Sequence, residues 1–375
     1  MPKKRILIIY TTAGAGHKKA AFAIKRAFDE IASGAEVDII DSLDYTNKFF
    51  KISYPGSYIL MVTRIPVIWG YAYYILDNRI VYALLSWIRH ITNWINTRPL
   101  ARFLREKDYD VIITTHFLPP DVISMEGKSK IRGRLINVVT DYRLHSFWVS
   151  DATDLYVVAH EKTKSDLRLK YNIPDKKIKI CGIPIDPVFS KTKGRERLRG
   201  ALGIEKTLFT VLIGSGGFGV GPISELVKSF KGISIPVQLL VVCGKNRALL
   251  DEIEGLKGSL GVPVKAYGFI DNMDELMEAS DVIVTKTGGL MSSEALSKDL
   301  PMIGLAPIPG QESRNFNILK ESGVVIGADS VKDAPSIVKR IYEDKDFKTG
   351  LHKKIASVKR PDAALEIAKL AINSE

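Results

Sequence analysis

His17 is the residue whose type and setting best suit acid–base chemistry. It closes the turn TTAGAGH (11–17), which follows an apolar run at 5–10 and precedes an amphipathic stretch with helical spacing that begins at 18. An imidazole titrates near neutral pH, so it can take a proton from a hydroxyl group as a general base. A structural histidine fits the same setting, and the positive end of a helix dipole disfavours the imidazolium form. His116, which follows the apolar run at 110–114, is a weaker candidate of the same kind.

Two glycine-rich turns have the composition of a phosphate-binding loop. The first is TTAGAGH, the second is GSGGFGVGP (214–222), and each follows a strand-like run and opens a helix. Glycines let the backbone approach a ligand closely, and the free N–H groups of a helix start attract anions. The first turn fails the dinucleotide fingerprint because Lys19 stands at the third glycine position, and the second lacks an acidic residue about 20 positions later. A phosphate ligand therefore stays a candidate beside two ordinary tight turns.

The elements that position these turns form an α/β pattern, because short apolar runs alternate with helix-like segments along the chain. Strand-like runs occur at 5–10, 36–40, 110–114, 135–139, 154–158, 208–213, 237–242, 264–267, 281–285 and 301–305. The chain has 375 residues, about twice the usual size of one domain. The Gly- and Pro-rich stretch 179–191 reads as the crossing between two domains. We therefore expect two doubly wound Rossmann-like domains, 1–185 and 186–375, that face each other across a cleft.

The composition indicates a folded intracellular protein without a metal site. Hydrophobic residues make up 46% and charged residues 26%, with no low-complexity stretch, which excludes disordered and collagen-like proteins. Cys181 and Cys243 are too few for a disulfide framework or a four-cysteine zinc site. The N-terminus lacks a secretory signal pattern. The Asp-x-Asp triplets at 108–110 and 344–346 suit surface charge better than metal ligation.

The segment 45–105 combines positive charge with aromatic residues. In a chain of net charge +12, it holds eight Lys or Arg against Asp77 alone, and 13 of the 32 aromatic residues. Its longest uncharged runs, 52–63 and 65–76, have 12 residues each, whereas a transmembrane helix needs about 20. The aromatic residues lie among Ile, Leu and Val, which suits hydrocarbon better than nucleic-acid bases. We expect an interfacial helical segment on an anionic membrane surface, with a helical subdomain whose aromatic residues form a core as the alternative.

Six segments carry a family resemblance by their order and spacing. In the second half, the pattern resembles the nucleotide-sugar-binding domain of GT-B glycosyltransferases, through GSGGFGVGP, GFIDNM (268–273), KTGGLMSSEAL (286–296) and PIPGQESRN (307–315). The branch it resembles is shared by the lipid II-forming N-acetylglucosaminyltransferase and the monogalactosyldiacylglycerol and processive diacylglycerol glycosyltransferases. In the first half, TTAGAGH and VTDYRLHSFW (139–148) resemble the Gly-rich loop and the V-T-D-x-x-x-H-x-x-W segment of the diacylglycerol branch. Ala13 and Ala15 depart from that branch's glycine-richer loop, and the resemblance is weakest across 45–105.

The resemblance implies a UDP-sugar-dependent hexosyltransferase. Such an enzyme moves glucose or galactose from the UDP-sugar, its co-substrate, to the hydroxyl of diacylglycerol with inversion and forms a β-glycolipid, without a metal or a cofactor. It would be cytoplasmic and peripherally associated with the inner face of the cell membrane, and it would have no nucleic-acid partner. Three alternatives stay open: a polyprenyl-linked acceptor, a UDP-sugar 2-epimerase, and a non-enzymatic nucleotide-sugar-binding protein.

The resemblance also implies roles for individual residues. Glu294 matches a residue that accepts hydrogen bonds from ribose hydroxyls, and Ile270 matches the position whose backbone reads uracil. The implied donor-binding set is Gly16, Ser215, Gly216, Gly217, Phe269, Ile270, Thr287, Gly288, Gly289, Glu294, Gln311, Glu312 and Asn315. His17 is the first choice for the base and Asp141 the second, with His145, Trp148 and His116 on the acceptor side.

Overall fold

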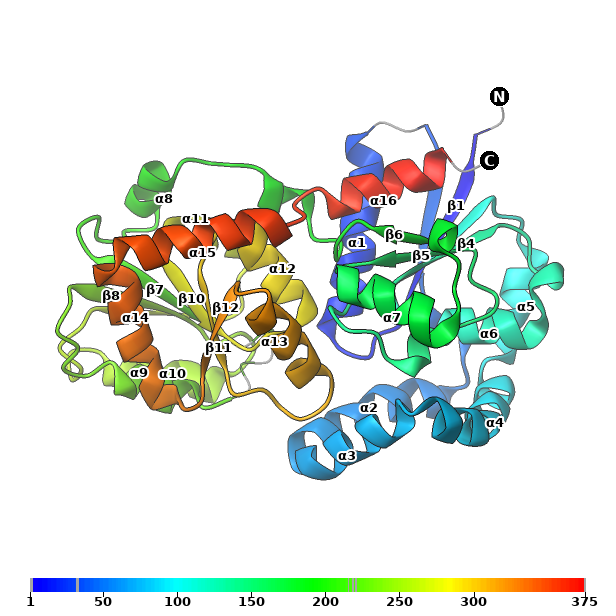
Figure 1. Ribbon diagram of the computed structural model, residues 1–375, viewed down its shortest axis with the longest axis horizontal. Coiled ribbons are helices and arrows are strands. Elements are labelled where there is room, and N and C mark those ends of the chain that lie inside the picture. Colours follow the sequence, from blue (N-terminus) through cyan, green and yellow to red (C-terminus); the bar gives the residue numbers. More distant parts are fainter. Residues whose placement is uncertain (1–2, 32–33, 215, 218, 220, 374–375) are drawn as a thin grey trace. The chain divides into compact units, whose positions relative to one another are not determined.

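The computed structural model describes residues 3–31, 34–214, 216–217, 219 and 221–373, and Figure 1 shows them as a ribbon. The chain divides into two compact units. The first contains the described residues up to Pro187, together with Ile308–Arg314 and the described residues from Asp362 onward. The second contains Val188–Pro307 and Asn315–Pro361.

The first unit is built on a six-stranded parallel sheet in the order β2-β1-β3-β4-β5-β6. The strands are β1 (Arg5–Tyr10), β2 (Glu36–Asp41), β3 (Val111–Thr114), β4 (Arg134–Val138), β5 (Leu155–Val158) and β6 (Ile178–Ile180). Side chains alternate between the two faces of β1. Ile6 and Ile8 pack under α1 (Ala15–Glu30), whereas Leu7 and Ile9 pack under α5 (Arg98–Glu106) and α6 (Leu118–Glu126). Burial on both faces explains the continuous apolar runs in the sequence.

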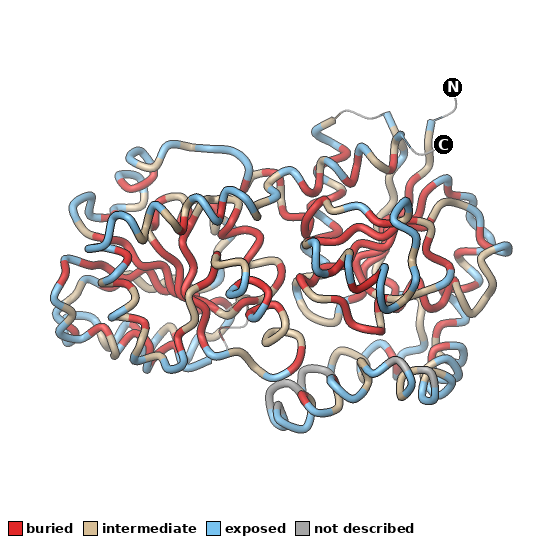
Figure 2. Tube along the Cα trace, in the orientation of Figure 1, coloured by how far each residue is buried: buried red, intermediate tan, exposed pale blue. Residues whose placement is uncertain are grey.

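Residues 48–96 form three helices that we call the helical arm. They are α2 (Lys48–Arg64), α3 (Pro66–Leu76) and α4 (Arg79–Asn96). Pro66 starts α3 and Asn78 caps α4 through its side chain, so each break has a local cause. Figure 1 shows the arm apart from the layers that cover the first sheet, and Figure 2 shows that much of it is exposed. Within the described ranges, no helix is long and apolar enough to cross a membrane.

The second unit contains another six-stranded parallel sheet, in the order β12-β11-β10-β7-β8-β9. Its strands are β7 (Phe209–Gly214), β8 (Val237–Val242), β9 (Val264–Tyr267), β10 (Val282–Thr285), β11 (Met302–Leu305) and β12 (Val325–Ala328). The helices are α8 (Arg195–Ala201), α9 (Ile223–Ser229), α10 (Arg247–Leu256), α11 (Met273–Ala279), α12 (Gly289–Ser297), α13 (Gln311–Glu321), α14 (Ala334–Glu343) and α15 (Lys345–Val358). One apolar core joins the sheet to α9, α10, α14 and α15. The predicted α/β fold is thus confirmed, and all ten predicted strands end within one residue of their expected positions.

The chain contains elements that the sequence analysis missed or placed differently. Strand β6 falls partly inside 179–191, where a domain crossing was expected, because three residues with a central lysine make no readable apolar run. Helix α7 (Glu161–Tyr171) follows β5 and covers the same edge of the sheet. Helix α1 begins at Ala15, so His17 lies inside its first turn.

The expected C-terminal domain, 186–375, is wrong in two segments. Helix α16 (Ala363–Ile372) packs against α1 in the first unit, since Ala364, Ala368 and Ala371 meet the alanine-rich face of that helix. Small side chains on both helices let their axes approach closely. Residues Ile308–Arg314 also belong to the first unit, where they contact α3 and Asp141.

Candidate active site

In both sheets the candidate residues gather beside the first strand. β1 lies between β2 and β3, and β7 lies between β8 and β10. The chain therefore leaves β1 and its neighbour β3 in opposite directions, and it leaves β7 and its neighbour β10 in opposite directions. Such a reversal opens a crevice at the carboxyl edge of a parallel sheet. The turn 11–17 and His116 meet there in the first unit. The described part of the turn 214–222 and residues 286–289 meet there in the second, because β7 and β10 are hydrogen-bonded neighbours.

His17 is held by the ends of two other strands. Its Nδ1 lies 2.7 Å from the backbone oxygen of Thr115 and 3.1 Å from Oγ1 of Thr140. A carbonyl oxygen only accepts hydrogen bonds, so Nδ1 carries the proton and Nε2 is left as a proton acceptor. Thr115 makes a second hydrogen bond to His17, because its hydroxyl donates to the backbone oxygen of that residue. The geometry is that of a neutral imidazole with its basic nitrogen available.

The pKa of His17 lies below its ordinary value. Burial is the main cause, because it disfavours the charged imidazolium. The negative charge of Asp141 and the hydrogen bond to Thr115 act in the opposite direction and raise the pKa. A base that is neutral at pH 7 and has a carboxylate nearby can accept a proton and then be stabilised as a cation.

His116 is a second neutral imidazole, with the opposite tautomer. It is buried, and its Nδ1 accepts from the backbone N–H of Leu118 at 3.0 Å, so its proton is on Nε2. Its ring meets that of His17 nearly at right angles, with 4.6 Å between the centroids. Burial, followed by the neighbouring His17, holds its pKa well below the ordinary range. His116 can therefore donate a hydrogen bond where His17 accepts one.

Asp141 follows β4 and is buried, with 4% of its surface exposed. Its Oδ1 accepts a hydrogen bond of 2.5 Å from Nε2 of Gln311. Glu312 follows Gln311 in the chain, and its carboxylate accepts a hydrogen bond from the backbone N–H of Ile308 at 3.3 Å. Gln311 thus reaches the predicted base region of the first unit, although the sequence placed it with donor-binding residues of the second half.

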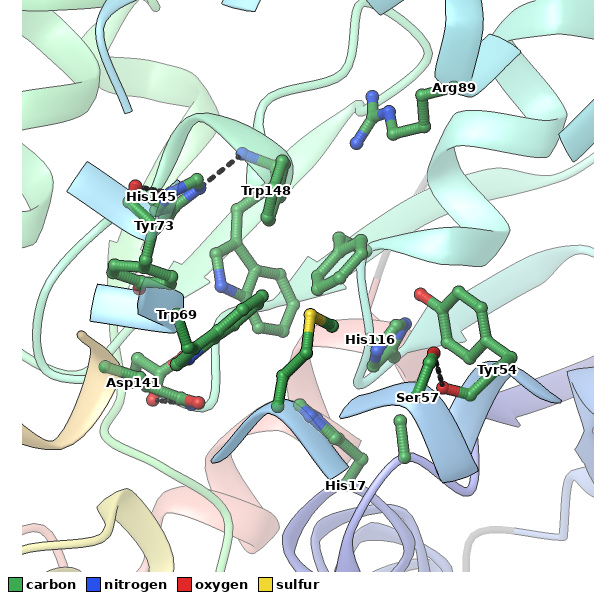
Figure 3. A pocket seen from close by; sticks show the side chains of 15 residues that line it. His17, Tyr54, Ser57, Trp69, Tyr73, Arg89, His116, Asp141, His145 and Trp148 are labelled. Atoms are coloured by element: carbon green, nitrogen blue, oxygen red, sulfur yellow. Dashed lines mark hydrogen bonds between the residues drawn. The ribbon is translucent and has the colours of Figure 1, made fainter. Parts of the chain in front are cut away.

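A cavity of about 260 Å³ lies over these groups in the first unit. The polar groups in its wall come from His17, His116, His145, Asp141, Arg89 and Gln311. Figure 3 labels the first five of these side chains. The rest of the lining is mostly aromatic and comes from the arm and from the strand ends: Tyr54, Trp69, Tyr73, Phe117, Phe147 and Trp148. A mostly apolar cavity with a base in its wall suits a hydroxyl group attached to an apolar body.

His145 and Trp148 have different parts in this cavity. Both ring nitrogens of His145 are used, because Nδ1 accepts from the N–H of Phe147 at 3.1 Å and Nε2 donates to the backbone oxygen of Tyr73 at 3.0 Å. Burial lowers the pKa of His145 to about 4. His145 therefore ties α3 to the segment 144–148 and has no nitrogen left for acid–base work. Trp148 is 2% exposed, and its ring centroid lies 6.1 Å from that of His17.

Sequence reasoning missed several residues that shape the cavity. Thr115 comes directly after β3, and Thr140 comes two residues after the end of β4, and these positions were the available signal. Tyr73 lies in the apolar helix α3 and Arg89 in the amphipathic helix α4, where spacing alone singles out neither side chain. Only their side-chain contacts mark them.

The second unit carries the predicted phosphate-binding elements. Thr287 is buried, and Gly288 and Gly289 open α12, which has no side-chain cap on its first N–H groups. Gly216 has a φ of 81°, and Gly217 lies beside the ring of Phe269. These backbone groups have the properties of an anion site at a helix start. Ser215 lies outside the described residues.

The remaining predicted donor residues lie on several different elements. Glu294 is buried in α12, and Asn315 is buried in α13. Phe269 and Ile270 follow β9, with Phe269 53% exposed and Ile270 half-buried. In the first unit, Gly16 lies in the first turn of α1.

Two family models cover most of the chain. Residues 17–185 match monogalactosyldiacylglycerol (MGDG) synthase, a range that begins at His17, and residues 209–318 match the glycosyltransferase family 28 C-terminal domain. A probable monogalactosyldiacylglycerol synthase, chloroplastic, from Glycine max is 31% identical over 97% of this chain and 70% of its own. The chain belongs to the monogalactosyldiacylglycerol synthase family. It is a glycosyltransferase, as the sequence analysis predicted.

Other members and more distant structures agree with this assignment. A processive diacylglycerol beta-glucosyltransferase from Bacillus cytotoxicus is 28% identical to this chain, over 98% of this chain and 93% of its own. MurG from Acinetobacter baumannii has a TM-score of 0.63 at 12% identity and covers 98% of this chain with 99% of its own. The UDP-GlcNAc 2-epimerase from Neisseria meningitidis, bound to UDP-GlcNAc, has a TM-score of 0.58 at 15% identity, with 98% of each chain covered. These structures establish the GT-B fold, which transferases and epimerases share.

Proposed function

We propose that this protein is an inverting glycosyltransferase that moves glucose or galactose from a UDP-sugar to the hydroxyl of diacylglycerol and forms a β-glycolipid. Membership of the monogalactosyldiacylglycerol synthase family supports the class of reaction. The observation that carries the proposal is the cavity of the first unit, where the basic Nε2 of a neutral imidazole meets a mostly aromatic wall. That combination fits an acceptor with one reactive hydroxyl on a lipid body.

In this mechanism His17 Nε2 takes the proton of the acceptor hydroxyl. The hydroxyl oxygen forms a bond to the anomeric carbon, and the bond from that carbon to the diphosphate oxygen breaks, with its electron pair leaving on UDP. Attack from the face opposite the leaving group turns an α-linked donor into a β-glycoside. Asp141 stabilises the imidazolium that forms, and the His116 Nε2–H is a donor for an oxygen of the acceptor.

We assign the nucleotide part of the donor to the turns of the second unit, and we assign hexose-binding roles to Gln311 and Glu312. The uncapped N–H groups at the start of α12 would stabilise the charge that develops on the departing diphosphate, without a metal ion or a further cofactor. Glu294 would accept hydrogen bonds from the ribose hydroxyls, and the backbone of Ile270 would read the uracil. A helix start suits this task because its N–H groups are already aligned before the charge appears.

We also propose that the enzyme works at an anionic membrane surface, peripherally on the cytoplasmic face. Helix α4 supports this, because apolar side chains that are 47–71% exposed recur along one side of it at Ile80, Leu84, Trp87, Ile88, Ile91, Trp94 and Ile95. Such a stripe is costly in water and stable in the headgroup region of a bilayer. The positive charge of the segment 45–105 would add attraction to anionic lipid.

The reaction is tested by incubating the protein with UDP-glucose or UDP-galactose and dioleoylglycerol in vesicles that contain phosphatidylglycerol. We expect the extracted lipid to contain a hexosyl diacylglycerol, and NMR of the product to show a β-linkage. Free sugar without a lipid product would contradict the proposal in favour of a 2-epimerase or a hydrolase. Transfer to a polyprenyl-linked acceptor alone would assign another substrate.

Membrane docking is tested by sedimentation with anionic and neutral vesicles. The double variant Leu84→Ser/Trp87→Ser removes two large exposed side chains, each worth about 1.5–3 kcal/mol when buried, so we expect the bound fraction to fall steeply. Leu169→Ser in α7 is the matched control, since Leu169 is 76% exposed but lies outside the arm. Binding that is insensitive to the double variant and to moderate salt would contradict docking through α4.

A further inference from the structure

Tyr54 of helix α2 is one of the residues that line the cavity of the first unit. Its ring packs against that of Phe50, with 4.9 Å between the centroids, and against the apolar core that the sheet forms with α5 and α6. The ring centroid of His116 lies 6.2 Å away. Figure 3 shows His116 between Tyr54 and His17, and the hydroxyl end of Tyr54 points toward the interior of the lining. The phenol is therefore held in place, with one side chain between it and the base.

The Tyr54 hydroxyl is a donor that the protein leaves available. No hydrogen bond joins it to a described residue, and it is not one of the described side-chain atoms that are sealed from solvent without a bond. The hydroxyl of this half-buried residue is thus open to the cavity. Burial raises the pKa of Tyr54 above its ordinary value, so the hydroxyl keeps its proton at neutral pH. Polar groups in protein interiors are nearly always paired, so a donor of this kind in a cavity indicates a ligand oxygen.

The charges around the hydroxyl narrow the kind of oxygen. Arg89 lowers the pKa of Tyr54 and Asp121 raises it, and these two side chains form an ion pair with 2.7 Å between Nη2 and Oδ1. The pair leaves little net charge at the hydroxyl. A phosphate or carboxylate oxygen would bring an uncompensated charge to a mostly aromatic wall, whereas a neutral carbonyl oxygen has the required lone pairs at a smaller cost of desolvation.

A diacylglycerol offers three kinds of oxygen to such a donor. Its hydroxyl is assigned to His17. The alkoxy oxygens of its esters are weak acceptors, because their lone pairs are delocalised toward the carbonyl groups. The carbonyl oxygens remain, and they belong to the same glycerol unit as the hydroxyl, so one molecule can engage His17 and Tyr54 together.

We propose that the Tyr54 hydroxyl donates a hydrogen bond to an ester carbonyl oxygen of the acceptor lipid while the hydroxyl of that lipid lies at His17. Tyr54 is then a specificity-determining residue, which selects acceptors with ester-linked chains over acceptors with ether-linked chains. This inference rests on the proposed function, because it places diacylglycerol in the cavity.

The test compares dioleoylglycerol with the corresponding dioleyl diether in the same vesicles. We expect the wild-type enzyme to prefer the diester by about threefold to thirtyfold in kcat/KM, the effect of one hydrogen bond whose donor is otherwise left unpaired. Tyr54→Phe removes the hydroxyl and keeps the ring that packs against Phe50. It should therefore lower the diester value to the diether value and leave the diether value unchanged.

Tyr82→Phe is the matched control. Tyr82 lies beside the same guanidinium, 4.9 Å from ring centroid to carbon, but its hydroxyl is sealed from solvent and it is not among the described residues that line the cavity. The ratio of diester to diether use should stay at the wild-type value in this variant. Equal use of both acceptors by the wild type would overturn the proposal. An equal loss for both acceptors in Tyr54→Phe, or the same fall in the ratio in both variants, would also overturn it. Absence of product with either acceptor would instead refute the proposed function.

Discussion

The turns after β1 and β7 occupy equivalent positions in two sheets of related topology, yet they present different chemistry. The turn after β1 brings His17 against Thr115 and Thr140 under an aromatic wall. The turn after β7 lies beside the glycines that start α12, where the available groups are backbone N–H groups. Topology thus gives the two turns equivalent positions, and the residues of each turn decide whether it presents an imidazole or backbone N–H groups.

The glycines of the two turns also differ in their surroundings. A Cβ added at Gly16 would meet nothing within 4 Å. A Cβ added at Gly219, whose φ is 59°, would collide with the backbone oxygen of Cys243. Gly16 of the first turn therefore lies in open space, whereas Gly219 of the second turn is closely packed, although Gly216 of that turn is as open as Gly16.

The largest expected effect is loss of the base that distinguishes the first turn. His17→Ala should lower kcat by about 100-fold to 10,000-fold, the range for a general base, and leave the affinity for UDP unchanged. Initial rates and calorimetry with UDP measure the two quantities. His352→Ala in α15 is the control, because His352 pairs with Asp299 in the second unit. Retained turnover in His17→Ala would show that His17 is not the general base and would contradict the chemical difference between the two turns.

The packing difference between the turns is tested by alanine at each glycine. Gly219→Ala should lower the free energy of unfolding by about 2–5 kcal/mol, because a left-handed alanine is strained and the methyl group is overpacked. Gly16→Ala, in the first turn of α1, should raise it by up to about 1 kcal/mol through helix propensity. Thermal or denaturant unfolding measures both. Similar losses at both positions would show that the turns are packed alike.

The contact between α3 and the segment Ile308–Arg314 gives a smaller effect. Asp77 pairs with Arg314 at 2.7 Å, and Tyr74 meets Ser313 at 3.1 Å, so α3 holds the segment that carries Gln311. Asp77→Asn should raise the KM for the UDP-sugar about fivefold to thirtyfold, with a smaller change in kcat.

Asp175→Asn is the control for this variant, since Asp175 is part of an exposed ion pair. Rates as a function of UDP-sugar concentration measure the effect. A lower thermal stability with an unchanged KM would assign Asp77 a purely structural role.

The smallest effect is a shift of the pH profile. Asp141 raises the pKa of His17, so Asp141→Asn should lower that pKa further. A general base works only when it is deprotonated, and the acid limb of the kcat profile should therefore move to lower pH. Rates between pH 4 and pH 8 measure the shift. An acid limb at the same pH in the variant and the wild type would show that Asp141 does not raise the pKa of His17.

Much of the fold and part of the site could be predicted from the residues. The strands were predictable because burial on both faces produces unbroken apolar runs, and His17 and Asp141 were predictable because they follow such runs. His145 was placed near the acceptor, but its two hydrogen bonds, to Tyr73 and Phe147, show that it positions other groups. The sequence could not decide which unit α16 packs on, because an alanine-rich face fits many partners equally well.

The sequence by itself determined the alternation of strands and helices, the two glycine-rich turns and the basic, aromatic composition of the segment 45–105, because each depends on residues close together in the chain. Only the tertiary structure decided which nitrogen of His17 is basic and that Gln311 reaches Asp141. These properties depend on hydrogen-bond partners that are distant in the chain. Spacing along a sequence carries no record of such partners.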